Sequence, residues 1–176
     1  MGHIVAEHWL NAELSRVFAF FSDPRNLPRL MPGEMDVRLE DTRILSPRQG
    51  TGDVVVKSGE DSDLIAGPGS LIIISFRLVP FLPFRGKWVA EILEYQPLSY
   101  FLDTQRSGPM RSWLHRHSFS KVDRGGIPGT VVRDEVNYEL PFGILGSLAD
   151  TLLVERMMRR TFQTRQRQLE SFFPPE

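Results

Sequence analysis

The 176-residue chain contains no cysteine, which excludes disulfide bonds and thiolate chemistry and is compatible with a reducing compartment. It also lacks an excess of basic residues, because 21 Lys and Arg stand against 22 Asp and Glu, for a net charge of -1. Domains that bind nucleic acids usually carry a clear basic excess. We therefore expect no nucleic-acid partner.

Long apolar runs are missing as well. The most apolar stretch, residues 71–84, is interrupted by Arg77, Pro80 and Pro83, so it cannot cross a bilayer as a helix. The first residues lack the apolar core of a signal peptide. From these features we expect a soluble, cytoplasmic protein without a transmembrane segment.

Familiar catalytic signatures are also absent. The sequence has no Ser-His-Asp nucleophile motif, no glycine-rich phosphate loop and no Rossmann fingerprint. Its 41% apolar and 24% charged residues are those of an ordinary globular protein. At this length we expect residues 1–176 to form one domain that buries about 70% of the surface of the unfolded chain.

The clearest structural signal is a predicted β-hairpin between Gly108 and Gly143. Apolar and polar residues alternate along residues 110–120 and again along residues 130–141, which is typical of half-buried strands. Turn-forming residues at 123–129 separate the two segments. The two arms are therefore expected to pair as neighbouring antiparallel strands.

This alternation places several polar side chains on the inner face of the hairpin. In the second arm Val132 and Val136 mark the core side, and Asp134 and Tyr138 share it. In the first arm the inward side chains are Trp113, His115, His117 and Phe119. Asp103 joins them if the preceding strand keeps register. Buried polar groups need partners, so this face is either a closed hydrogen-bond network or the wall of a pocket.

The pair His115 and His117 also suggests a metal site. Two imidazoles on one strand face can bind zinc or iron together with a nearby carboxylate. A cupin-type site takes that carboxylate from a few residues downstream, where this chain has Ser120, Lys121 and Val122. We therefore predict no metal and no other cofactor.

The C-terminal segment changes to helical periodicity. From about Leu145 to Phe173, apolar residues recur with a period near 3.6. The predicted apolar stripe comprises Leu148, Leu152, Val154, Met158, Phe162, Leu169 and Phe173. Glu155 and Arg159 interrupt it, and we expect an i,i+4 pair at its edge. A helix of this length, roughly 40 Å, could cross a whole sheet.

The remaining segments complete an α+β fold. Residues 3–10 alternate as a strand, and residues 11–30 have the spacing of two short helices, with Asn11 as N-cap. Further strand-like runs follow at 35–45, 53–57, 71–79, 88–95 and 98–106. We predict one curved antiparallel sheet of about seven strands wrapped around the long C-terminal helix, with a cavity between them.

The turn at residues 80–84 is unusually apolar for the end of a hairpin. Exposed Phe81 and Phe84 would form a contact surface. It could be a flap at the cavity entrance, a tip for transient membrane contact or a dimer contact; alternatively, the turn folds back onto the core. Both a monomer and a homodimer remain open.

Element order and local motifs together resemble the START-like, helix-grip (SRPBCC) superfamily. That group includes polyketide cyclases/dehydrases, bacterial lipid- and quinone-binding proteins and the major birch pollen allergen. The motifs, similar to those of a bacterial branch, are Phe101-x-Asp103-x-Gln105-x-x-Gly108-Pro109, Trp113-x-His115-x-His117-x-Phe119 and Asp134-x-Val136-x-Tyr138-x-x-Pro141-Phe142-Gly143. The resemblance implies a helix-grip fold and a hydrophobic ligand cavity, but no particular reaction.

We therefore expect binding, transport or sequestration of a small hydrophobic or amphipathic molecule between sheet and helix. The predicted ligand-binding residues are Asp103, Trp113, His115, His117, Phe119, Asp134, Val136, Tyr138, Met158 and Phe162. The alternatives are a cyclase/dehydrase-like enzyme whose cavity histidine transfers protons, and a contact module that uses the apolar turn. Fully paired buried histidines would favour binding or structure over catalysis.

Overall fold

The computed structural model describes residues 1–47, 65–77, 83–141 and 148–174. Seven strands form one antiparallel sheet in the order β1-β7-β6-β5-β4-β3-β2, so only the first strand is placed out of sequence, next to the last. Their bounds are β1 Gly2–Leu10, β2 Arg38–Arg43, β3 Leu71–Phe76, β4 Gly86–Gln96, β5 Tyr100–Ser107, β6 Ser112–Arg124 and β7 Ile127–Glu139. The predicted antiparallel sheet is confirmed.

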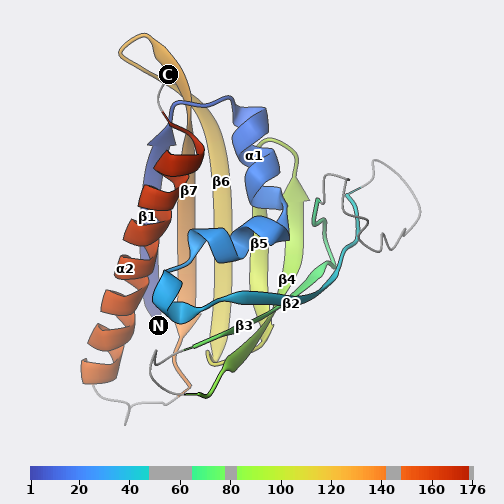
Figure 1. Cartoon of the computed structure of the whole chain (residues 1–176), viewed down its shortest axis with the longest axis vertical. Helices are drawn as coiled ribbons and strands as arrows, with labels where there is room; N and C mark the ends of the chain where they lie inside the picture. Colours follow the sequence, from blue (N-terminus) through green and yellow to red (C-terminus); the bar gives the residue numbers. More distant parts are fainter. Residues whose placement is uncertain (48–64, 78–82, 142–147, 175–176) are drawn as a thin grey trace.

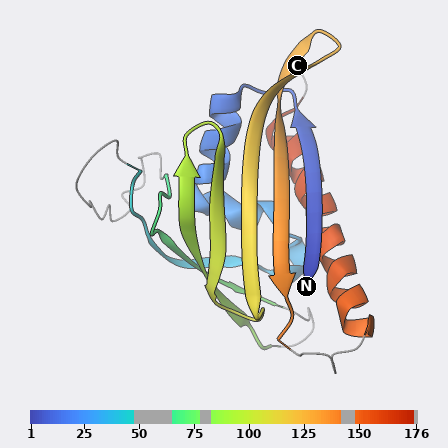
Figure 2. The same cartoon turned by 180° about the vertical axis from the view of Figure 1, so that it is seen from behind.

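The helices cover one face of this curved sheet (Figure 1). They are α1 Leu14–Ser22, the 3-10 segments η1 Pro24–Leu30 and η2 Gly33–Met35, and the long α2 Leu148–Phe172. The long helix runs beside β1, whereas α1 and η1 lie across the middle of the sheet. Seen from behind, the opposite face carries none of these helices (Figure 2). The predicted α+β class is confirmed.

The hairpin of β6 and β7 has the register that the alternation predicts. Trp113 lies opposite Tyr138, and His117 lies opposite Asp134. The reversal is tighter than expected, because it consists of Gly125 and Gly126 alone, with φ of 63° and 84°. Two consecutive positive φ angles are what a two-residue hairpin turn requires, and glycine reaches them without strain.

The start of α1 differs from the prediction. Its N-cap residue is Glu13, whose side chain makes no capping hydrogen bond. Ala12 is still held by the sheet: its N–H donates to the Leu10 carbonyl (2.9 Å) and its carbonyl accepts from Thr130 Oγ1 (2.7 Å). The prediction of Asn11 as N-cap is therefore wrong, because these contacts delay the helix.

Aromatic packing under α1 forms the centre of the core. Phe18 is 4% exposed. Its ring lies 5.4, 6.4 and 5.0 Å from those of Tyr95, Phe101 and Phe119. Edge-to-face contacts at these separations add to the stabilisation from burial alone. This packing fixes α1 against β4, β5 and β6.

The stripe along α2 is partly as predicted. Met158, Phe162, Leu169 and Phe173 are buried. Leu152 is 62% exposed, so its assignment to the buried stripe is wrong. The N-terminal end of α2 extends past the start of β1 (Figure 1). Glu155 and Arg159 form the expected pair, with Arg159 Nη2 donating to Glu155 Oε1 at 2.6 Å.

Some predicted segments are shorter or fall elsewhere. The strand expected at 35–45 begins only at Arg38, after η2 and a left-handed residue, Asp36, with φ of 41°. The runs at 53–57 and 78–79, the side chain of Leu148 and Phe81 lie outside the described residues. Within the described ranges, no helix has the length and apolar character needed to cross a membrane.

Candidate functional site

A cavity of about 220 Å³ lies between the concave face of the sheet and the helices. Most of its wall is apolar. The strands contribute Ile72, Ile74, Ala90 and Ile92, and η1 contributes Leu27 and Leu30. The alternation of residues 72–76 and 88–92 could have identified the strand contributions, because both runs direct every second side chain inward.

Six of the ten predicted ligand-binding residues line this cavity: Asp103, Trp113, His115, His117, Met158 and Phe162. The other four, Phe119, Asp134, Val136 and Tyr138, are buried behind the wall and do not line it. Val136 and Tyr138 pack under Met158 and Phe162, and Phe119 packs against Phe18. Direct ligand contact stays a prediction for the six.

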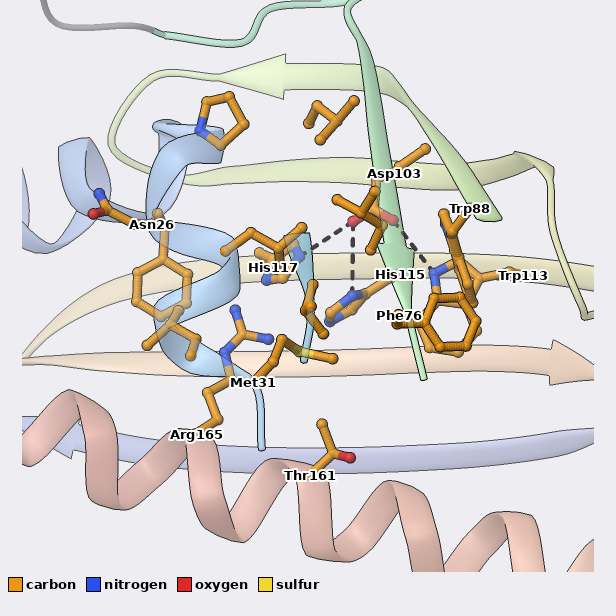
Figure 3. A pocket seen from close by; sticks show the side chains of 18 of the residues that line it. Asn26, Met31, Phe76, Trp88, Asp103, Trp113, His115, His117, Thr161 and Arg165 are labelled. Carbon is orange, nitrogen blue, oxygen red and sulfur yellow. Dashed lines mark hydrogen bonds and ion pairs between the residues drawn. The ribbon is translucent and has the colours of Figure 1, made fainter. Parts of the chain in front are cut away.

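Two imidazoles lie side by side in the wall of the cavity, next to Asp103 (Figure 3). Their ring centroids are 3.8 Å apart. His115 has Nδ1 3.6 Å from Asp103 Oδ2 and Nε2 3.1 Å from Asp134 Oδ1. His117 has Nε2 3.2 Å from Asp103 Oδ2 and Nδ1 2.6 Å from Asp134 Oδ1. Each imidazole therefore faces both carboxylates.

Strand register brings these four side chains together. His115 and His117 are two residues apart on β6, so they share a face. Asp103 on β5 lies opposite His115, and Asp134 on β7 lies opposite His117. Trp113, two residues before His115, donates from Nε1 to Asp103 Oδ1 at 3.3 Å. The cluster thus depends on the pairing of three consecutive strands.

Arg165 of α2 completes this cluster and was not predicted. Its side chain is 10% exposed, and Nη1 lies 3.5 Å from Asp134 Oδ1. The guanidinium also lies over the Phe21 ring, 4.8 Å from its centroid. The signal was present, because Arg165 follows Phe162 by three residues and precedes Leu169 by four. An arginine at that spacing faces inward and requires a partner.

The pKa values reflect burial and the neighbouring charges. Burial alone would raise the pKa of Asp134, but Arg165 and then His117 and His115 hold it well below its ordinary value. The pKa of Asp103 is also lowered, because contacts with His117 and His115 outweigh burial. Two ionised carboxylates and one guanidinium leave one negative charge in the cluster.

The histidines themselves shift in opposite directions. Burial, followed by the neighbouring His117, lowers the pKa of His115. Burial acts on His117 in the same sense, but the charge of Asp134 and the hydrogen bond with Asp103 raise its pKa overall. A proton on His117 and a neutral His115 would make the five-residue cluster electrically neutral.

Comparison with known proteins agrees with this architecture. A family model for polyketide cyclase / dehydrase and lipid transport proteins matches residues 10–167. The chain belongs to this family. The resemblance to the START-like superfamily is thereby confirmed. No curated protein sequence matches the chain.

Solved structures similar to this member of the polyketide cyclase / dehydrase and lipid transport family come from bacteria and plants. A Thermus thermophilus protein is 18% identical, covers 97% of this chain and 95% of its own, and has a TM-score of 0.59. Protein Ms6760 of Mycobacterium smegmatis is 12% identical (99% and 91% covered, TM-score 0.62). The major latex-like protein 151 of Panax ginseng is 11% identical (99% and 98%, 0.60). These similarities establish the helix-grip fold alone.

Proposed function

We propose that the protein binds a small hydrophobic or amphipathic molecule in the cavity between the sheet and α2. The observation that carries this proposal is a largely apolar cavity whose wall holds one compact group of charged and polar side chains, Asp103, His115, His117 and Arg165. Ligand sites commonly combine such a wall with a few convergent polar groups that fix orientation. Membership of a family described by lipid transport as well as by cyclisation supports the same reading.

The size and polarity of the cavity suggest a compact ligand. Its volume of about 220 Å³ is below the roughly 300–1,000 Å³ of sites for drug-sized molecules. The apolar body of the ligand would lie against Ile74, Ala90 and Ile92. A hydroxyl or carbonyl group at its other end would approach His117, Asp103 and Arg165, which line the cavity. Such a group replaces the water that these side chains would otherwise require.

The pairing of the histidines favours binding over the cyclase or dehydrase alternative. A general base needs a nitrogen free to take a proton from the substrate. One nitrogen of each histidine is hydrogen-bonded to a carboxylate, His115 Nε2 to Asp134 Oδ1 at 3.1 Å and His117 Nε2 to Asp103 Oδ2 at 3.2 Å. The other two nitrogens also face carboxylate oxygens, at 3.6 and 2.6 Å, but without hydrogen-bond geometry. If the alternative holds, His117→Gln should abolish conversion of a polyketide-like substrate and leave its binding intact.

Tryptophan fluorescence offers a direct test of the proposal. Trp88 and Trp113 line the cavity with centroids 4.9 Å apart, whereas Trp9 bonds to the Val122 carbonyl elsewhere. Because the sequence has three tryptophans, Trp9→Phe leaves only the cavity pair. Titration with a compact aromatic probe, 2-naphthol, should then change their emission. Native mass spectrometry of protein from cells would identify a co-purified molecule.

A variant that fills the cavity tests the same proposal. Ala90→Phe places a ring in the cavity and should weaken probe binding by at least about tenfold, since a blocked site loses several contacts. Leu114→Phe adds the same ring on the outward face of β6, where Leu114 is 39% exposed, and should not change binding. Equal binding by a folded Ala90→Phe variant would contradict the proposal.

A further inference from the structure

Three atoms of the kind that bind transition metals converge at the polar end of the cavity. Asp103 Oδ2 lies 3.6 Å from His115 Nδ1 and 3.2 Å from His117 Nε2. One ligand atom from each of these residues lies within 4.8 Å of the others. Bonds of about 2.0–2.2 Å in a tetrahedral zinc site place neighbouring nitrogen and oxygen ligands roughly 3.3–3.6 Å apart. The two distances from Asp103 are already close to that range, and the two histidine nitrogens, which lie within 4.8 Å of each other, would complete the set.

The opposite edges of the two imidazoles support the same interpretation. His115 Nε2 and His117 Nδ1 both face Asp134 Oδ1, at 3.1 and 2.6 Å. Metal-bound histidines characteristically hold their second ring nitrogen against a carboxylate, which fixes ring orientation and tautomer. Asp134 is fully buried, and Arg165 pairs with it from α2. Asp134 is thus placed to orient both rings from behind.

We propose that Asp103, His115 and His117 bind one divalent transition-metal ion, Zn²⁺ or Fe²⁺, with Asp134 as the positioning residue. Two imidazoles and one carboxylate are a donor set that suits both metals. All three ligand residues line the cavity. The remaining coordination positions would therefore open toward the bound molecule, where they could accept its oxygen. The proposal goes beyond ligand binding and does not depend on it.

The fold removes the objection that argued against a metal site at the level of the sequence. No carboxylate follows His117 within a few residues of the chain. Asp103 instead comes from the neighbouring strand β5, where it lies opposite His115. The two residues are 12 apart along the chain, and the pairing of β5 with β6 brings them together.

Metal binding can be measured on the full-length, tag-free protein after chelator treatment. Calorimetry with ZnCl₂ should find one ion per chain, and Co²⁺ should give visible absorption bands. Asp103→Asn and His115→Gln should each weaken Zn²⁺ binding by at least about 100-fold, and Asp134→Asn by roughly 10–100-fold, the loss typical of a missing outer-shell carboxylate. His3→Gln is the control, because His3 is exposed and pairs with Glu135 at 3.2 Å.

Nitrogen chemical shifts of the wild type keep the test independent of how the variants fold. Zn²⁺ should shift Nδ1 of His115 and Nε2 of His117 and leave His3 and His8 unchanged. Absence of stoichiometric Zn²⁺ binding, or binding that survives in folded Asp103→Asn, would overturn the proposal and leave a closed structural network. Probe binding by the metal-free protein would still support the proposed function, so the two outcomes are separable.

Discussion

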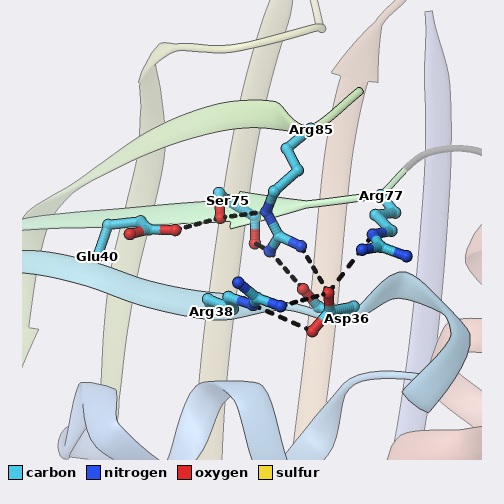
Figure 4. Close-up of polar contacts among 6 residues, drawn as sticks. All are labelled: Asp36, Arg38, Glu40, Ser75, Arg77 and Arg85. Atoms are coloured by element: carbon cyan, nitrogen blue, oxygen red, sulfur yellow. Dashed lines mark hydrogen bonds and ion pairs between the residues drawn. The ribbon is translucent and has the colours of Figure 1, made fainter. Parts of the chain in front are cut away.

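Two clusters of carboxylates and basic side chains use similar chemistry in different surroundings. The buried cluster comprises Asp103, His115, His117, Asp134 and Arg165. The edge cluster comprises Asp36, Arg38, Arg77 and Arg85 and joins the start of β2, the end of β3 and the start of β4 (Figure 4). Asp134 has a side chain that is 0% exposed, whereas that of Asp36 is 35% exposed. Burial, more than the number of partners, separates the two clusters.

The arginine–carboxylate contacts of the edge cluster are shorter than the one in the buried cluster. Arg85 Nη1 donates to Asp36 Oδ2 at 2.6 Å, and Arg38 Nη2 donates to the same oxygen at 3.0 Å. Water can replace these partners, and salt screens them. The carboxylate of Asp134 has no such replacement, because losing one member of a buried ion pair leaves the other charge unsolvated. We therefore expect the longer contact, 3.5 Å between Asp134 and Arg165, to be the more critical one.

The largest expected effect is on Asp134. Asp134→Ala should lower the free energy of unfolding by about 3–5 kcal/mol, because it leaves Arg165 buried without its carboxylate. Asp36→Ala, the matched variant of the edge cluster, should shift the urea midpoint much less. Urea titrations at neutral pH in chelator-containing buffer measure both. Similar losses in the two variants would show that burial does not distinguish the clusters.

A double-mutant cycle tests whether Asp134 and Arg165 act as a pair. Combining Asp134→Ala with Arg165→Met should cost less than the sum of the single changes, with a coupling of about 1–3 kcal/mol, as for contacting residues in one network. The corresponding cycle of Asp36→Ala and Arg38→Met should give a much smaller coupling. Additive losses for the buried pair would mean that Arg165 serves through its packing on Phe21 instead.

The two clusters also mark what could be predicted from the sequence. His115 and His117 were placed correctly because period-two alternation along two long strands determines which side chains face inward. Trp113, Phe119 and Tyr138 share that face, but alternation cannot separate the cavity wall from the core behind it. That distinction depends on which side chains of α1 and α2 lie above each position, and therefore on how the helices cross the sheet.

Non-local contacts explain the remaining errors. Arg165 was missed although its spacing placed it inward, because its partner Asp134 lies on another element. Glu155 and Arg159 were found because both partners are on one helix, four residues apart. Leu152 fits the apolar stripe of α2 by its spacing, and only the tertiary structure shows that it is exposed. The edge cluster likewise joins three strands that are distant in sequence.

The pKa of Asp36 should depend on salt, as expected for an exposed cluster. A hydrogen bond from Arg38, followed by contacts with Arg85, lowers the pKa of Asp36 below its ordinary value of 3.8. The ionised Asp36 carboxylate therefore stabilises the folded state above pH 3.8. This stabilisation is lost as the pH falls through the lowered pKa. Carboxyl NMR titration should give a midpoint below 3.8 that rises toward it in about 1 M salt, where the screening length is near 3 Å. A midpoint unaffected by salt would indicate that Asp36 is shielded like the buried cluster.

The smallest stability effect is expected at Phe84, next to Arg85 of the edge cluster. Phe84 is 76% exposed and does not line the cavity, so its predicted role at the entrance stays untested. Phe84→Ser should change the free energy of unfolding by no more than about 0.5 kcal/mol, as is usual for exposed positions. Phe162→Ser is the matched control, because Phe162 is 6% exposed and truncation of a buried phenylalanine costs about 3–5 kcal/mol.

The same variant separates a contact surface from an incidental exposed ring. If Phe84 contributes to a contact surface, Phe84→Ser should slow probe uptake, reduce cosedimentation with phospholipid vesicles or change the mass in solution. If none of the three measurements changes, Phe84 is an isolated exposed side chain without a contact role. A loss of stability approaching that of Phe162→Ser would instead place the ring against the core. The neighbouring edge cluster would then be less exposed to water than we infer.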